Sequence, residues 1–132
     1  MTNNLFTRGQ LERKLSQEIQ AFYRQNLEHR PSKVVCQFFE TKLAIIIEDS
    51  ITNAELILLE EGKKDLAIQV RSNIDDAIQP EFKKLIQQIA NVTVIDVMSD
   101  ATFSTGRTGI IAILDRPPNV SNLESVPKLK KN

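Results

Sequence analysis

Ile51-Thr52-Asn53-Ala54-Glu55 stands between an apolar, strand-like run and a long helical run. Thr52 and Glu55 are three residues apart, which is the spacing of a capping box. In that motif each side chain bonds to a backbone amide that the first helical turn leaves unpaired. The stretch therefore marks a change from strand to helix and decides how the rest of the chain is divided.

Upstream of this stretch the sequence predicts one helix and one hairpin. Thr7 and Gln10 have the same capping-box spacing, and apolar residues then recur every three or four positions until Pro31. Residues 33–40 and 43–48 are apolar and rich in β-branched side chains, with only a short turn between them. A link this short favours an antiparallel hairpin.

Downstream the sequence predicts two or three helices. The four consecutive apolar residues 56–59 predict a helix that is buried nearly all round. Gly62 marks the end of that run, and an amphipathic pattern begins at Lys63. Pro80 either kinks this long helix or begins a new one at its first turn. The stripe continues from residue 81 to residue 90 in both cases.

A second hairpin is expected after Asn91. Residues 92–98 and 109–114 are rich in β-branched side chains, and the polar link 99–108 contains Gly106, which tolerates a positive φ. The predicted order is helix, hairpin, helices, hairpin. Two hairpins most simply join into one four-stranded antiparallel sheet with helices packed on it, which is an α+β fold.

Both faces of these strands are apolar, and residues 43–47 contain no polar side chain at all. Helices on one face cannot cover the other. The economical expectation is a homo-oligomer, with a dimer favoured, formed through the sheet face or the first helix. The alternative is that the first helix crosses to the opposite face and closes the core of a monomer.

Size and patterning predict one domain with tails: a flexible N-terminus at residues 1–6, a single α+β domain at 7–115 and a disordered basic tail at 116–132. The tail has four basic residues and one acidic residue, so it carries +3 in a chain whose net charge is zero. The body carries −3. The tail is either a solvated end or a weak contact for an anionic membrane or an acidic partner.

Composition excludes several classes of protein. The zero net charge and the 5% aromatic content argue against a nucleic-acid binder. The single cysteine, Cys36, rules out an internal disulfide and a CxxC site, and it reads as a small buried hydrophobe. The first residues do not resemble a signal peptide, and no apolar run approaches the ~20 residues that span a bilayer. A soluble cytoplasmic protein is expected.

The best candidate for a binding site is the link 99–108, which offers hydroxyls, backbone amides and one guanidinium for a small anion. The alternative is an ordinary hairpin loop with local caps. The only histidine, His29, either contacts the last carbonyls of its helix or joins an anion site. No metal site, cofactor, catalytic residue or enzymatic activity is expected. The candidate ligand-binding residues are Arg107, Asp100, Ser99, Gly106, His29 and Arg30.

In the order and spacing of its landmarks, the chain resembles the MpsC-like family of small bacterial proteins over about residues 8–115. The residues that carry the resemblance are Gly9-Gln10-Leu11-Glu12, Tyr23, Pro31, Leu43 to Glu48, Thr52-Asn53-Ala54-Glu55, Glu61-Gly62, Pro80, Phe82, Val92-Thr93-Val94, Ser99-Asp100 and Gly106. The resemblance implies an accessory piece of a cation-translocating, membrane-potential-generating system, whose membrane components are linked to inorganic carbon uptake.

Two hypotheses follow. The first is a non-enzymatic, oligomeric accessory or regulatory protein that docks to a partner system, such as a membrane transport complex. The second is a small-anion-binding sensor that uses the link 99–108, with His29 or Arg30 contributing from the other end of the chain. The second hypothesis requires that these groups converge.

Overall fold

The computed structural model describes residues 5–128 and contains three α-helices, four strands and one short 3-10 helix within them. The predicted order of helix, hairpin, helices and hairpin is confirmed. The elements are α1 (Arg8–Leu27), β1 (Lys33–Phe39), β2 (Lys42–Glu48), α2 (Asn53–Glu60), α3 (Lys64–Ala90), β3 (Val94–Thr102), β4 (Arg107–Leu114) and η1 (Leu123–Ser125).

The four strands form one antiparallel sheet in the order β1-β2-β4-β3, as the two hairpins predict. The hairpins join through β2 and β4, where Ile45 stands opposite Ile110. The most apolar strands are therefore central, and β1 and β3 are the edges. The predicted α+β fold is confirmed.

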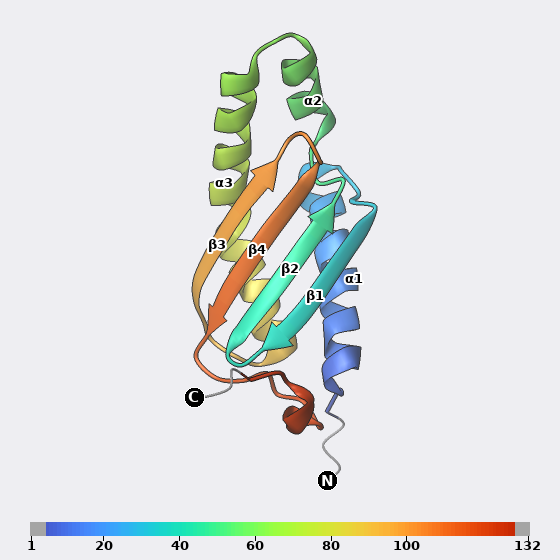
Figure 1. The fold of residues 1–132 in the computed structure, drawn as a ribbon, viewed down its shortest axis with the longest axis vertical. Coiled ribbons are helices and arrows are strands. Elements are labelled where there is room, and N and C mark those ends of the chain that lie inside the picture. The colour runs from blue at the N-terminus through green and yellow to red at the C-terminus, as the bar shows by residue number, and fades with distance from the viewer. Residues whose placement is uncertain (1–4, 129–132) are drawn as a thin grey trace.

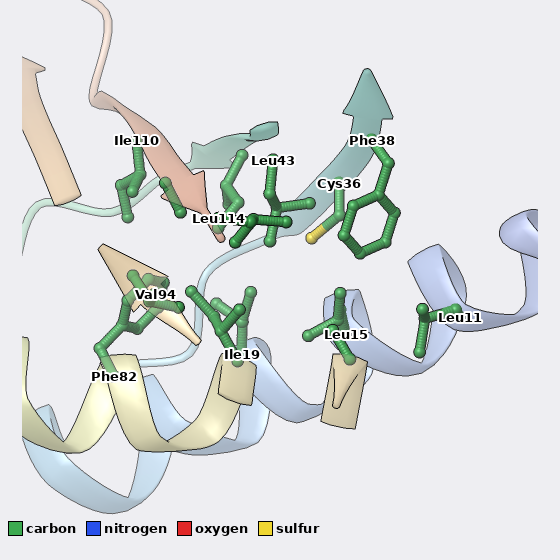
Figure 2. Packing of buried hydrophobic residues seen from close by; sticks show 14 of the residues in the cluster. Leu11, Leu15, Ile19, Cys36, Phe38, Leu43, Phe82, Val94, Ile110 and Leu114 are labelled. Atoms are coloured by element: carbon green, nitrogen blue, oxygen red, sulfur yellow. The ribbon is translucent and has the colours of Figure 1, made fainter. Parts of the chain in front are cut away.

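Both long helices lie on the same face of the sheet (Figure 1). Apolar side chains from α1 and α3 meet those of the strands in one core, including Leu15, Ile19, Phe38 and Phe82 (Figure 2). The capping box at Thr7 and Gln10 begins α1, as its sequence predicts. The alternative in which the first helix crosses to the opposite face is wrong, since α1 packs beside α3.

The other face, called the outer face below, is covered by no element of residues 5–128 (Figure 1). Val35 and Ile46 on it are 44% and 45% exposed, whereas Cys36 and Ile45 on the inner face are buried. Strand geometry explains the contrast, because successive side chains point to opposite faces. The second apolar face that the sequence predicts therefore lies open in this chain.

One sequence-based boundary differs from the structure, and one open alternative is decided by it. Strand β3 extends to Thr102, so Ser99 and Asp100 lie in a strand and the turn that follows spans only residues 103–106. Pairing of Asp100 with Gly109 satisfies backbone groups that a polar loop would leave to solvent. Of the two alternatives at Pro80, a new helix is wrong, because α3 runs as one helix from Lys64 to Ala90. Pro80 is exposed, so water can replace the backbone hydrogen bond that proline cannot donate.

The chain after β4 also differs from the disordered tail predicted from residue 116. Val120 and Val126 are buried and join the core, and η1 lies between them. The amide of Glu40 donates to the carbonyl of Pro127 at 2.7 Å. Two valines among polar residues are too weak a pattern to predict that this segment packs against the core. Residues 1–4 of the predicted flexible N-terminus and 129–132 of the predicted tail lie outside the described residues.

Helix α2 and the first half of α3 form a helical hairpin that projects past the end of the sheet (Figure 1). We call this hairpin, residues 53–75, the arm. The expectation that residues 56–59 are buried nearly all round is wrong within this chain, because Ile57 is 57% exposed and Leu56 is also exposed. The buried residue of α2 is Glu55. Helix α2 packs on α3 and has no strand beneath it.

Candidate functional site

A buried ion pair holds the two helices of the arm together. Arg71 of α3 is 4% exposed and Glu55 of α2 is fully buried. The Nε atom of Arg71 donates to Oε2 of Glu55 at 2.8 Å, and Nη2 donates to Oε1 at 2.6 Å. This two-point geometry is the strongest way in which an arginine can bind a carboxylate.

The same carboxylate completes the helix cap that the sequence predicts. The amide of Thr52 donates to Oε1 of Glu55 at 3.2 Å, and the Thr52 hydroxyl accepts from the amide of Glu55. The Thr52 hydroxyl also donates to Oε1 of Glu55 at 2.8 Å. Glu55 is thus both the cap of α2 and the partner of Arg71, so the start of α2 and its contact with α3 depend on one side chain.

Arg71 also ties the arm to the end of the sheet. Its Nη2 atom donates to the carbonyl of Ser50 at 2.8 Å. Ser50 contacts the β3–β4 hairpin in turn: its amide donates to the carbonyl of Gly106 at 2.8 Å, and its hydroxyl lies 2.7 Å from that of Thr108. Ser50 and Thr108 are both buried. These bonds connect α3, the β2–α2 link and the β3–β4 hairpin.

Asp75 lies on the remaining side of Arg71, with Oδ1 3.5 Å from Nη1. Nη1 is buried without a hydrogen bond, so this contact is an ion pair only. Burial raises the pKa of Asp75, and the positive charge of Arg71 opposes that shift. Burial would lower the pKa of Arg71, but its bonds to Glu55 and the nearby Asp75 outweigh burial and raise it.

Two of the predicted ligand-binding residues meet α3. Ser99 and Asp100 of β3 line a groove together with Asp75 and Asp76 of α3, and the exposed amine of Lys64 lies at the same groove. The carboxylate of Asp100 accepts a hydrogen bond from the adjacent amide of Ala101. Asp75 and Asp76 place two carboxylates here beside the amine of Lys64, and the charge of Arg71 is already met by Glu55, so the groove is acidic. Because side chains alternate along a strand, Asp100 borders the groove but points its own side chain to the outer face.

The other four predicted residues do not converge on one site. Arg107 binds the carboxylate of Glu48 on the neighbouring strand, and the carbonyl of Gly106 accepts from Ser50. His29 bonds through Nε2 to the carbonyl of Asp49, and Arg30 lines a small hollow on α1 with Arg24. Thus His29 and Gly106 both contact the 49–50 link, whereas Arg107 binds Glu48 on the sheet and Arg30 lies at the hollow on α1.

The sequence reasoning missed Glu55, Arg71 and Asp75 as a unit. A signal was present, because Arg71 follows Ala67 by four residues and precedes Ile78 by seven, which places it within the apolar stripe of α3. A charged residue on a buried stripe requires a partner of opposite charge. The sequence could not identify that partner as Glu55, which lies on a different helix.

This arrangement is suited to holding a rigid arm. Arg71 is enclosed by protein, and its hydrogen bonds go to Glu55 and Ser50, so the pair itself presents no accessible reactive group. In residues 5–128 there is no group of three His, Cys, Asp or Glu side chains that could hold a metal ion. None of the helices described in that range combines the length and apolar character needed to cross a membrane.

Comparison with known proteins gives one family. A family model described as "Na+-translocating membrane potential-generating system (MpsC)" matches residues 7–116, which include every helix and strand from α1 to β4. No curated protein and no solved structure matches the chain. The match covers most of the sequence, including both capping boxes, so the chain belongs to the MpsC family.

Proposed function

We propose that this protein is a non-enzymatic accessory or regulatory component of a Na+-translocating, membrane-potential-generating system, and that it acts as an oligomer. The family description supports the link to such a system. The observation that carries the proposal is the arm, which holds exposed apolar side chains in a fixed position. An exposed apolar surface on an ordered element is typical of a binding surface for another protein.

The arm has the properties of a docking element. Leu56 and Ile57 on α2 and Leu66 and Ile68 on α3 are large, apolar and exposed. The Glu55–Arg71 pair lies between the two helices, so the arm is already ordered before it meets a partner. Pre-ordering lowers the entropy lost on association and thereby strengthens binding.

The occupant that fits this surface is an apolar segment of a protein component of the transport system. Anionic lipid is a poorer fit, because the arm carries Glu60, Glu61 and Asp65 beside its lysines. Lipid-binding helices instead gather Lys and Arg on their polar face. A location on the cytoplasmic side, next to membrane components of the system, is part of this proposal.

The small-anion sensor has less support. It requires the groups at 99–108 to converge with His29 or Arg30, but Arg107 is engaged by Glu48 and the groove at Ser99 is lined by Asp75 and Asp76. Carboxylates around the binding groups repel an anion. This hypothesis predicts that Arg107→Ala abolishes stabilisation by phosphate or bicarbonate in a thermal-shift assay. An unchanged ligand response in that variant would exclude it.

The accessory role is tested by purifying the tagged chain, with mild crosslinking, from its own cells and identifying the membrane proteins that accompany it. The expected partner is a component of a Na+-translocating system. The double variant Leu56→Asn/Ile57→Asn should reduce recovery about tenfold, which corresponds to a loss of about 1.4 kcal/mol for the two apolar contacts together.

The control is Leu123→Asn, which changes a similarly exposed apolar residue in η1, away from the arm, and should leave recovery of the partner unchanged. Thermal unfolding of all variants should remain close to that of the parent chain. Failure to recover any membrane transport protein with the parent chain would overturn the accessory role. Equal recovery with the arm variant would overturn docking through the arm.

A further inference from the structure

The outer face of the sheet has an apolar centre. Two adjacent rows of paired residues form it. One row contains Val35 and Ile46, and the next contains Ala44, Ile111 and Met98. Val35, Ile46 and Met98 are exposed, and the other two are half-buried. Because these residues lie on adjacent strands in paired register, they form one continuous patch.

Charged side chains lie at opposite edges of this patch. Lys33 is on the β1 edge, and Asp96 and Asp100 are on the β3 edge. None of these three forms an ion pair within residues 5–128. Between the edges, Glu48 and Arg107 form an ion pair, so their charges cancel. The β1 edge of the outer face therefore carries one positive charge, and the β3 edge carries two negative charges.

We infer that the outer face binds a second copy of this chain about a two-fold axis that runs parallel to the strands. Rotation about that axis exchanges the two edges, so β1 of one copy lies over β3 of its partner. The registers then bring Lys33 of each copy close to Asp100 of the other, while the apolar centres meet. Two sheets pack face to face in this way about 10 Å apart, with nearly aligned strands.

The charge pattern selects this axis over the other two-fold axis that could stack the sheets. An axis perpendicular to the strands places β3 over β3, so that Asp96 and Asp100 face the same residues of the second copy. Like charges brought together across an interface oppose association. An anionic lipid surface is disfavoured for the same reason, because the acidic β3 edge would be repelled.

This inference deepens the proposed function, because it assigns a surface to the oligomer. It also separates the two apolar surfaces: the outer face is assigned to a second copy and the arm to the transport partner. The two lie on different elements, so one chain can use both at once.

The first test is sedimentation equilibrium of the full chain, which should show a dimer at micromolar concentrations. Ile46→Asp should yield a monomer, because it places a charge in the centre of the apolar patch. Ile46 is 45% exposed, so circular dichroism and the midpoint of thermal unfolding should show that the fold persists. The matched control is Ile57→Asp on the arm, which should remain dimeric.

Charge reversal tests the axis. Asp100→Lys sets a positive charge opposite the partner's β1 edge and should weaken the dimer about fivefold at low salt. Adding Lys33→Asp to the same chain should restore association. With the perpendicular axis, Asp100→Lys would instead strengthen the dimer, by facing Asp96 of the second copy.

A monomeric parent chain, or a dimer that persists in Ile46→Asp, would overturn the inference. A stronger dimer in Asp100→Lys would overturn the axis. Neither result affects recovery of the membrane partner through the arm, so failure of the dimer and failure of the accessory role can be told apart.

Discussion

The core and the arm are built from similar apolar residues but are held in different ways. In the core, side chains from the strands and from α1 and α3 contact one another, and Ile45 and Ile86 are fully buried. In the arm, Leu56 and Ile57 are exposed, and the buried contact is the ion pair between Glu55 and Arg71. Apolar content alone therefore does not decide which side chains are buried. That depends on whether another helix or strand packs against them.

The largest effect should come from the core. Phe38→Ala removes a fully buried ring from β1 and should lower the free energy of unfolding by about 3–5 kcal/mol, because it leaves a cavity. Val35→Ala on the same strand is the control. At protein concentrations low enough for the chain to be monomeric, it should cost less than about 1 kcal/mol, since Val35 points to the outer face. Urea denaturation measures both. A similar loss for the two variants would show that the outer face is already covered.

The next effect concerns the arm. Glu55→Gln leaves the buried charge of Arg71 without its counter-ion and should lower the free energy of unfolding by about 3 kcal/mol. This is the low end for breaking a buried pair, because α2 can move and admit water. Hydrogen exchange should show faster opening in α2 while the strands stay protected. Glu60→Gln, an exposed change on the same helix, should have no effect. Loss of protection throughout the sheet would contradict a local role.

The two capping boxes allow the core and the arm to be compared through a smaller change, the loss of one helix cap in each. Thr52→Ala should cost about 1 kcal/mol and increase opening of α2, because the hydroxyl caps the helix and also bonds to Glu55. Thr7→Ala removes the corresponding cap of α1, which the core holds along its length, so exchange in the rest of α1 should change little. Amide exchange measured by NMR distinguishes them. Equal opening of both helices would argue against a separately held arm.

The last effect is confined to alkaline pH. Burial raises the pKa of the Cys36 thiol from 9.0 to about 11. The unfolded thiol therefore ionises while the folded thiol stays protonated, so unfolding releases a proton and the free energy of unfolding falls as pH rises from about 9 to 11. Burial also raises the pKa of Tyr23 to about 12, which adds a similar loss beginning near pH 10.

Cys36→Ala is the control for this pH dependence. Its stability should be flatter between pH 9 and 10, and the loss above pH 10 from Tyr23 should remain. Chemical denaturation at half-unit pH intervals gives the comparison. An identical slope in the parent chain and the variant would show that Cys36 makes no contribution.

The sequence predicted the elements because their signals are local. Capping boxes at Thr7 and Thr52 are made within a single turn, and strand pairing follows from the short link at Thr41. The candidate site was predicted less well. Ser99 and Asp100 do meet α3 in a groove, but the Glu55–Arg71–Asp75 unit was missed because its partners come from two helices.

By itself the sequence determined the order of helices and strands, the antiparallel hairpins, the two helix caps and membership of the family, all of which depend on residues near one another in the chain. Only the tertiary structure decided that α1 and α3 share one face, that Val126 joins the core and that α2 stands clear of the sheet. These outcomes depend on contacts between distant segments, whose free energies no local pattern contains.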